Sequence, residues 1–181
     1  GRWTRRRASD PSVVEKLDIN TAQMRAVLET LACTVQGQSA PDQDTTVFSG
    51  GLLAGLLYEA GVRIYPEDLL DYLSQHAGIL VSSAPQEFHF IHRSFQEHLA
   101  ACELTYDRPI ERRPPVPQDR RFPQGLVERT IKRPDLWSNV LQLAADELLA
   151  QDRQRDFWLL LANLCGPLVK QKQFAEAAML S

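Results

Sequence analysis

The chain has 181 residues, a hydrophobic content of 44% and a formal net charge of −3, which is ordinary for a globular protein with a sizeable buried core. The slightly negative charge provides no general attraction to nucleic acid or to an anionic membrane surface. The longest apolar runs, such as residues 158–162, are too short to cross a bilayer, and the start of the chain has no signal-peptide pattern, so a cytoplasmic location without membrane contact is expected.

Three helices are predicted in the first half of the chain. Residues 1–18 begin with several arginines and contain a turn signal. Asn20 is a typical helix cap, and an apolar stripe predicts a helix over about Thr21–Gln36. A polar loop leads to a second helix, rich in glycine, over about residues 49–60. A proline at the first helical position predicts a third helix over Pro66–His76.

A strand hairpin and a further helix come next. Residues 79–82 are predicted to form a strand, and residues 88–91, rich in aromatic and β-branched side chains, form its return strand. Three helices followed by a hairpin are the element order of a winged helix. Ser94 and Glu97 have the spacing of a capping box, which predicts that the next helix is capped by Ser94.

The composition changes after this helix. Residues 107–124 contain five prolines and many arginines, which predicts an extended connector. Helices are then predicted over about residues 134–149, 154–164 and 168–180, with the second ended by Gly166-Pro167. Short helices in this order resemble the start of an α-solenoid. The predicted fold class is therefore mainly α, with a winged helix and a short hairpin followed by a helical segment.

His92 lies at the predicted junction between the return strand and the next helix. A histidine can donate a hydrogen bond to a phosphate oxygen, and the N-terminus of a helix adds unpaired N–H groups and a favourable dipole. From the spacing alone, a half-buried histidine that bonds a backbone carbonyl is the commoner arrangement, and contact with a phosphate is the less common one; both alternatives stay open. The other histidines are expected to be solvated or structural: His89 on the open face of the hairpin, His98 off the apolar helix face, and His76 beside the terminal carbonyls of its helix.

No catalytic residue and no metal ligand is predicted. His92, Glu97 and His98 do not have the HExxH spacing of a zinc site. The three cysteines lack CxxC spacing, which favours buried thiols in a reducing compartment. Because no GxxxxGK[ST] or GxSxG motif occurs, the chain is not predicted to be an enzyme by itself.

A winged helix raises the question of DNA binding. The helix that would enter the major groove, Pro66–His76, carries Glu67, Asp68 and Asp71 and no lysine or arginine, so DNA phosphates would repel it. The basic residues lie near the start of the chain and in the predicted connector, where a solvated or partner-facing charge run is the commoner meaning. A winged-helix module that binds nucleic acid or protein remains the alternative function.

Residues 88–101, with the sequence FHFIHRSFQEHLAA, resemble the FxFxHxxFQEylAA signature at the end of the NACHT module. NACHT proteins are STAND-class signalling NTPases, a group that includes bacterial defence proteins and animal NLR receptors. Three further stretches resemble parts of that module: residues 68–81 in the winged-helix domain, 30–32 in its first helix, and 1–6 at the end of the preceding helical domain. The resemblance covers about residues 1–106 and departs from the signature at His98, where the family has an aromatic residue.

The resemblance implies a role for His92, because the corresponding family histidine contacts the β-phosphate of bound ADP and holds the resting state closed. The Walker A and Walker B segments of the family lie upstream, so the chain is expected to be a fragment of a longer protein and not to hydrolyse ATP alone. The implied cofactor is ADP or ATP with Mg²⁺ in the full-length protein, with none bound by the fragment. The implied partners are the rest of the NACHT module, further copies in an active homo-oligomer, and an activating ligand.

The resemblance also implies a division of the chain and a function. The parts are the end of a helical domain (1–18), the winged-helix domain (19–106), a linker rich in proline and arginine (107–124), and the start of a HEAT-like helical sensor domain (125–181). The winged helix is expected to sense bound ADP or ATP and to control switching to the active oligomer, in bacterial defence or innate-immune-type signalling.

Overall fold

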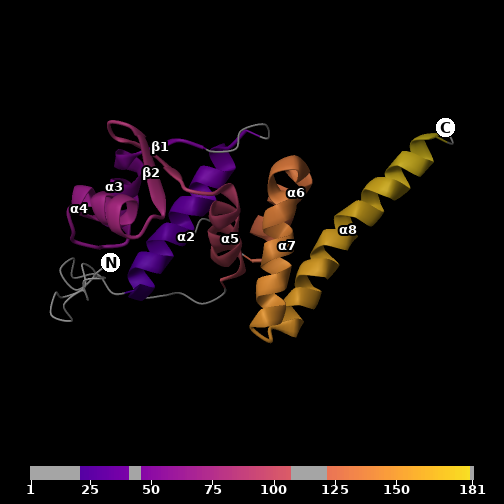
Figure 1. The fold of residues 1–181 in the computed structure, drawn as a ribbon. Helices are drawn as coiled ribbons and strands as arrows, with labels where there is room; N and C mark the ends of the chain where they lie inside the picture. Colours follow the sequence, from indigo (N-terminus) through magenta and orange to yellow (C-terminus); the bar gives the residue numbers. More distant parts are fainter. Residues whose placement is uncertain (1–20, 41–45, 107–121, 180–181) are drawn as a thin grey trace, which may run out of the picture.

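The computed structural model describes residues 21–40, 46–106 and 122–179, with side chains up to residue 166. Helices dominate these ranges and one small sheet accompanies them, which confirms the prediction of a mainly α protein (Figure 1). None of the helices in these ranges is both long and apolar enough to cross a membrane. The elements in chain order are α2 (Thr21–Gln38), β1 (Phe48–Ser49), α3 (Gly50–Glu59), α4 (Pro66–Asp71), the π-helical turn η1 (Tyr72–His76), β2 (Leu80–Ala84), β3 (Glu87–Phe90), α5 (Arg93–Thr105), α6 (Gln124–Lys132), α7 (Pro134–Ala150) and α8 (Gln154–Met179). The predictions for residues 1–18, the Asn20 cap and most of the predicted connector lie outside the described residues.

The sheet is antiparallel, with β3 in the centre and β1 and β2 on either side. Phe48 of β1 pairs with Phe88 of β3, and Leu80 of β2 pairs with Phe90 of β3. The β2–β3 hairpin confirms the two predicted strands, with ends that differ by one or two residues. The sequence does not predict β1, because a strand of two residues has no visible alternation of apolar and polar side chains.

The first core lies between α2, α3, the α4–η1 helix and the sheet. Leu31 of α2, Leu53 of α3, Leu73 of η1 and Phe90 of β3 are each at most 1% exposed. The rings of Phe48 and Phe90 have centroids 6.0 Å apart, so aromatic packing joins β1 to β3 on the inner side of the sheet. The apolar stripe predicted on the first helix is the face of α2 that contacts this core.

The second core lies between α5, α6 and α7. Ala100 and Leu104 of α5 are fully buried there, together with Trp137 of α7. Cys33 of α2 also belongs to this core, while Leu99 of α5 belongs to the first one. The helices α2 and α5 therefore contribute side chains to both cores, and they lie side by side in the middle of the molecule (Figure 1).

Three helices differ from the sequence predictions. The helix from Pro66 ends in the π-helical turn η1 rather than in a regular α-helix. α6 lies where the sequence predicts the end of the connector, because Pro123 caps a helix instead of continuing an extended segment. α8 is one helix from Gln154 to Met179, so the predicted end at Gly166-Pro167 is wrong. A proline removes one backbone donor and strains the preceding turn, and this cost has not ended α8.

Leu31→Ala should lower the free energy of unfolding by about 2–5 kcal/mol, because it leaves a cavity in a fully buried part of α2. Chemical denaturation followed by circular dichroism measures this change. The control is Tyr58→Ala on α3, since Tyr58 is 87% exposed and its loss should change the free energy by less than about 0.5 kcal/mol. Equal losses for the two variants would contradict the first core.

Candidate functional site

His92 lies between β3 and α5 and is the N-cap residue of α5. Its backbone is extended, with φ −139° and ψ 139°. The preceding residue, Ile91, donates its N–H to the carbonyl oxygen of Ile79 at 3.0 Å, which fixes the chain just before the helix begins. The side chain of His92 is exposed and makes no capping hydrogen bond. It is thus accessible to a ligand, and it is not the half-buried, carbonyl-bonded histidine of the alternative interpretation.

The predicted capping box is wrong. α5 begins at Arg93, so Ser94 lies in the first turn instead of capping it. Glu97 is buried, and its Oε1 accepts a hydrogen bond from the side chain of Arg93, Nε at 3.0 Å, instead of from the backbone N–H of Ser94 that a capping box requires. The first N–H groups of a helix have no intrahelical acceptors. Because the His92 side chain does not cap them, this end of α5 can present donors to an anion.

Gln96 connects the start of α5 to two other helices. Its side chain is buried, and its Nε2 donates to Gln36 Oε1 of α2 at 2.7 Å. Gln36 Nε2 donates in turn to the carbonyl oxygen of Leu136 in α7 at 2.9 Å. Unpaired amides are costly in such a buried place, so this network favours one arrangement of α2, α5 and α7. The sequence does not predict this network, because Gln36, Gln96 and Leu136 are far apart along the chain.

The remaining histidines have different surroundings. His89 pairs with the exposed Val81 in the strand that also holds the buried Phe90; it is half-buried, and its Nδ1 lies 2.9 Å from the carbonyl oxygen of Phe90. His76 is exposed at the end of η1. His98 is half-buried, and its Nε2 lies 3.7 Å from the Sγ of Cys102. It is therefore not the solvated side chain that the sequence predicts.

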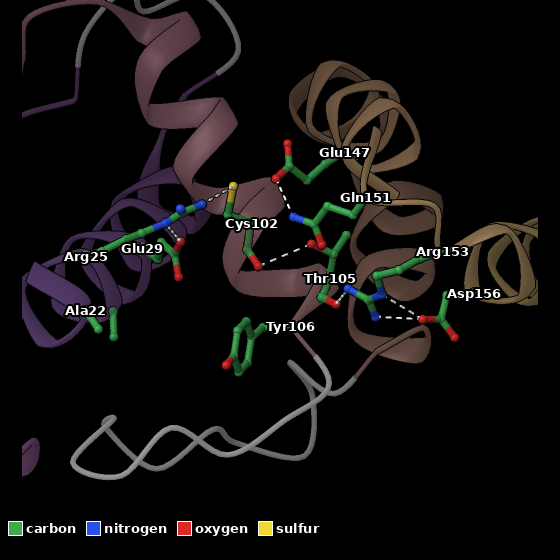
Figure 2. A pocket seen from close by; sticks show the side chains of 11 residues that line it. Ala22, Arg25, Glu29, Cys102, Thr105, Tyr106, Glu147, Gln151, Arg153 and Asp156 are labelled. Atoms are coloured by element: carbon green, nitrogen blue, oxygen red, sulfur yellow. Dashed lines mark hydrogen bonds and ion pairs between the residues drawn. The ribbon is translucent and has the colours of Figure 1, made fainter. Parts of the chain in front are cut away.

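A polar pocket of about 490 Å³ lies between α2, α5, α7 and the start of α8 (Figure 2). Charged side chains on its walls form two ion pairs. Arg25 Nε lies 2.7 Å from Glu29 Oε1, and Arg153 Nη2 lies 2.7 Å from Asp156 Oδ2. The third carboxylate, Glu147, accepts a hydrogen bond from the neutral amide of a glutamine, Gln151. The pocket thus combines two neutralised pairs with one carboxylate next to an amide.

Cys102 lies in the wall of this pocket, with its Sγ 3.7 Å from Arg25 Nη2. Burial, together with the negative charges of Glu29 and Glu147, raises the pKa of the Cys102 thiol from 9.0 to about 11, and Arg25 opposes this rise. The thiol is therefore protonated at neutral pH. Such a cysteine is a poor nucleophile.

The described residues include one group of three side chains that could hold a metal ion. The ligand atoms of His98, Cys102 and Glu147 all lie within 4.8 Å of one another. The other two cysteines lie elsewhere: Cys33 is buried in the second core, and Cys165 is exposed on α8, contrary to the predicted burial. Sequence reasoning misses the group because Glu147 belongs to a different helix from His98 and Cys102.

Comparison with known proteins assigns no family to the chain. No protein-family model matches it, and neither a curated protein nor a solved structure matches it. Any function therefore has to be argued from the geometry of the site and from the resemblance in residues 88–101.

Gln96→Ala should lower the free energy of unfolding by about 1–3 kcal/mol, because it leaves the buried amide oxygen of Gln36 without its donor. Urea denaturation of the two proteins measures the difference. Gln142→Ala on α7 is the matched control, since Gln142 is exposed and its truncation should have little effect. A loss no larger than that of the control would show that the network does not stabilise the fold.

Cys102 should make the protein less stable as the pH rises from about 9 to 11. In this range the thiol ionises in the unfolded chain and stays protonated in the folded one, so unfolding releases a proton and is favoured by higher pH. Denaturation at several pH values measures the slope in the parent protein and in Cys102→Ser, which lacks the ionisable thiol. The parent should lose more stability than Cys102→Ser, whereas Cys165→Ser should keep the parental slope; identical slopes for all three would contradict the raised pKa.

Proposed function

We propose that this chain is the non-catalytic regulatory part of a NACHT-type STAND signalling NTPase. Its winged helix senses whether ADP or ATP is bound and controls the switch to an active homo-oligomer in defence or innate-immune-type signalling in the cytoplasm. The observation that carries the proposal is the exposed His92 at the N-terminus of α5, within the stretch that resembles the NACHT signature. The catalytic residues and the Walker motifs would belong to a preceding segment.

The element order supports the winged-helix part of the proposal. The order α2-β1-α3-α4-β2-β3, with β3 between the other two strands, is consistent with a winged helix whose first strand is very short. The hairpin β2–β3 corresponds to the wing, and α5 follows it. The elements after α5 are helical, and α8 packs against α7 and then diverges from it toward its C-terminal end (Figure 1). This arrangement is consistent with the start of a HEAT-like sensor domain.

The residues around His92 fit the phosphate end of a nucleotide. When bound, the nucleotide supplies phosphate oxygens that accept hydrogen bonds and carry negative charge. The imidazole of His92 and the first N–H groups of α5 are donors, and the dipole of this 13-residue helix favours an anion at its N-terminus. The hydrogen bond of Ile91 to Ile79 keeps the histidine in place relative to the sheet. Such a site can hold a phosphate that a neighbouring domain delivers.

The buried network at Gln96 offers a route from the phosphate to the helical segment. Gln96 lies one helical turn after His92 and is linked through Gln36 to the start of α7. A change in the contact between His92 and a phosphate would therefore act on α2, α5 and α7 together. In the proposed switch, ADP favours the arrangement in which His92 is bound, and loss of that contact lets the winged helix and the helical segment move as one body.

Nucleic-acid binding is the alternative function of a winged helix, and the surface of α4 argues against it. Glu67, Asp68 and Asp71 are all exposed on the helix that would enter a major groove. Their negative charges would repel the phosphate backbone, which supplies most of the affinity of such modules. No observation on the described residues favours this alternative over nucleotide sensing.

His92→Ala, in the protein that carries this chain together with its nucleotide-binding segment, should weaken ADP retention about tenfold or more. The variant removes one charge-assisted hydrogen bond to phosphate. ADP content after purification, measured by ion-exchange chromatography, and signalling output without activator are the two readouts. ADP content should fall and basal output should rise.

The matched control for this experiment is His89→Ala, three residues away on the hairpin. His89 bonds the carbonyl oxygen of Phe90 and is not directed to the start of α5 by any described contact. Its removal should leave ADP content unchanged. If His92→Ala also retained parental ADP content and basal output, the proposed sensing role would be wrong.

A further inference from the structure

His98, Cys102 and Glu147 bring three different metal-ligating groups to one place. His98 and Cys102 are four residues apart on α5, so they share a helix face. Glu147 projects from α7, which packs against α5. All three sets of ligand atoms lie within 4.8 Å of one another, and His98 Nε2 lies 3.7 Å from Cys102 Sγ.

The distances fit a tetrahedral zinc ion. Zinc–sulfur and zinc–nitrogen bonds of about 2.3 and 2.0 Å place the sulfur and nitrogen ligands about 3.5 Å apart in a tetrahedron. The separation between Cys102 Sγ and His98 Nε2 is already close to this value. The carboxylate of Glu147 needs a shift of at most about 1.5 Å, which a rotation of its side chain can provide.

The surroundings of the three residues provide the support that metal ligands usually have. Gln151 Nε2 donates to Glu147 Oε1 at 2.6 Å and so orients the carboxylate. Cys102 and Glu147 also line the polar pocket, as Figure 2 shows, so a fourth position is open to water. Glu29 adds a second negative charge near the sulfur. A cation therefore meets one thiol, one imidazole and the Glu147 carboxylate, which is bonded to a neutral amide rather than to a cation.

We propose that His98, Cys102 and Glu147 bind a divalent cation of the zinc type, which joins α5 to α7. The combination of thiolate, imidazole and carboxylate suits zinc better than the oxygen-seeking magnesium or calcium ions. Because the two helices come from distant parts of the sequence, the ion would link the segment before residues 107–121 to the segment after them. This site is separate from His92 and needs no nucleotide.

Metal binding displaces the proton of the Cys102 thiol and the guanidinium of Arg25. The Cys102 thiol gives its proton to solvent as the sulfur–metal bond forms, so one proton is released for each ion bound and the affinity increases with pH. The guanidinium of Arg25 lies 3.7 Å from the sulfur and must move away. The Arg25 side chain is 59% exposed, so its guanidinium has room to turn toward solvent.

The test is a titration of the purified chain with Zn²⁺, together with Co²⁺ as the spectroscopic probe. We expect one ion per chain, a thiolate-to-cobalt charge-transfer band, and a melting temperature that rises with added Zn²⁺. Cys102→Ser should remove the charge-transfer band. Glu147→Gln should weaken Zn²⁺ binding by at least about tenfold, which is the loss typical even of an outer-shell partner.

Two control variants replace a cysteine and a histidine that lie outside the proposed metal site. Cys165→Ser removes an exposed thiol from α8, and His89→Gln removes the hairpin histidine, so both should bind Zn²⁺ as the parent does. Glu147 is half-buried, but its change to glutamine is isosteric, so Glu147→Gln should fold. Circular dichroism checks that it does. Absence of the charge-transfer band in the parent, its survival in Cys102→Ser, or parental affinity in folded Glu147→Gln would each overturn the proposal. None of these outcomes bears on nucleotide sensing by His92.

Discussion

The packing of α2 against α5 is the contact on which the rest of the molecule depends. Two buried polar pairs lie within it: Gln96 donates to Gln36, and Thr30 Oγ1 donates to Glu103 Oε2 at 3.2 Å. Apolar surfaces alone tolerate sliding, whereas an amide pair is satisfied only in one register. The bond from Gln36 to the carbonyl oxygen of Leu136 extends the same constraint to α7. The hairpin, the start of α5 and the polar pocket all take their places from these three helices.

The two proposed sites lie on the same helix and use different properties of it. His92 uses the helix terminus, where donors and dipole act together, and it is exposed because the chain passes there from strand to helix. His98 and Cys102 use the side of the helix, where a spacing of four residues places their side chains next to each other on one face. In these two proposals, α5 binds a phosphate at its N-terminus and a cation farther along, and neither site depends on the other.

Much of the local structure could be predicted from the sequence, and most of the long-range structure could not. Apolar periodicity predicts α2, α7 and the hairpin, since these signals lie within a few residues of each other. The capping-box spacing predicts Ser94 as the N-cap of α5, but the N-cap is His92 and Glu97 pairs with the side chain of Arg93 instead. β1 exists only through its pairing with a strand distant in sequence. Two of the three proposed metal ligands, His98 and Cys102, form an i,i+4 pair in the sequence, but Glu147 is placed by tertiary packing alone.

The shared membership of α2 and α5 in both cores has a consequence for how this polypeptide can be divided. The prolines and arginines of residues 107–121 suggest a boundary between a front part, the residues before 107, and a back part, the residues after 121. A chain cut there, however, would leave Ala101, Leu104 and the sulfur of Cys33 facing water, since α6 and α7 cover them. The exposed strip would favour self-association of the front part. In recombination or in module exchange, α2, α5, α6 and α7 therefore have to be kept together in one segment.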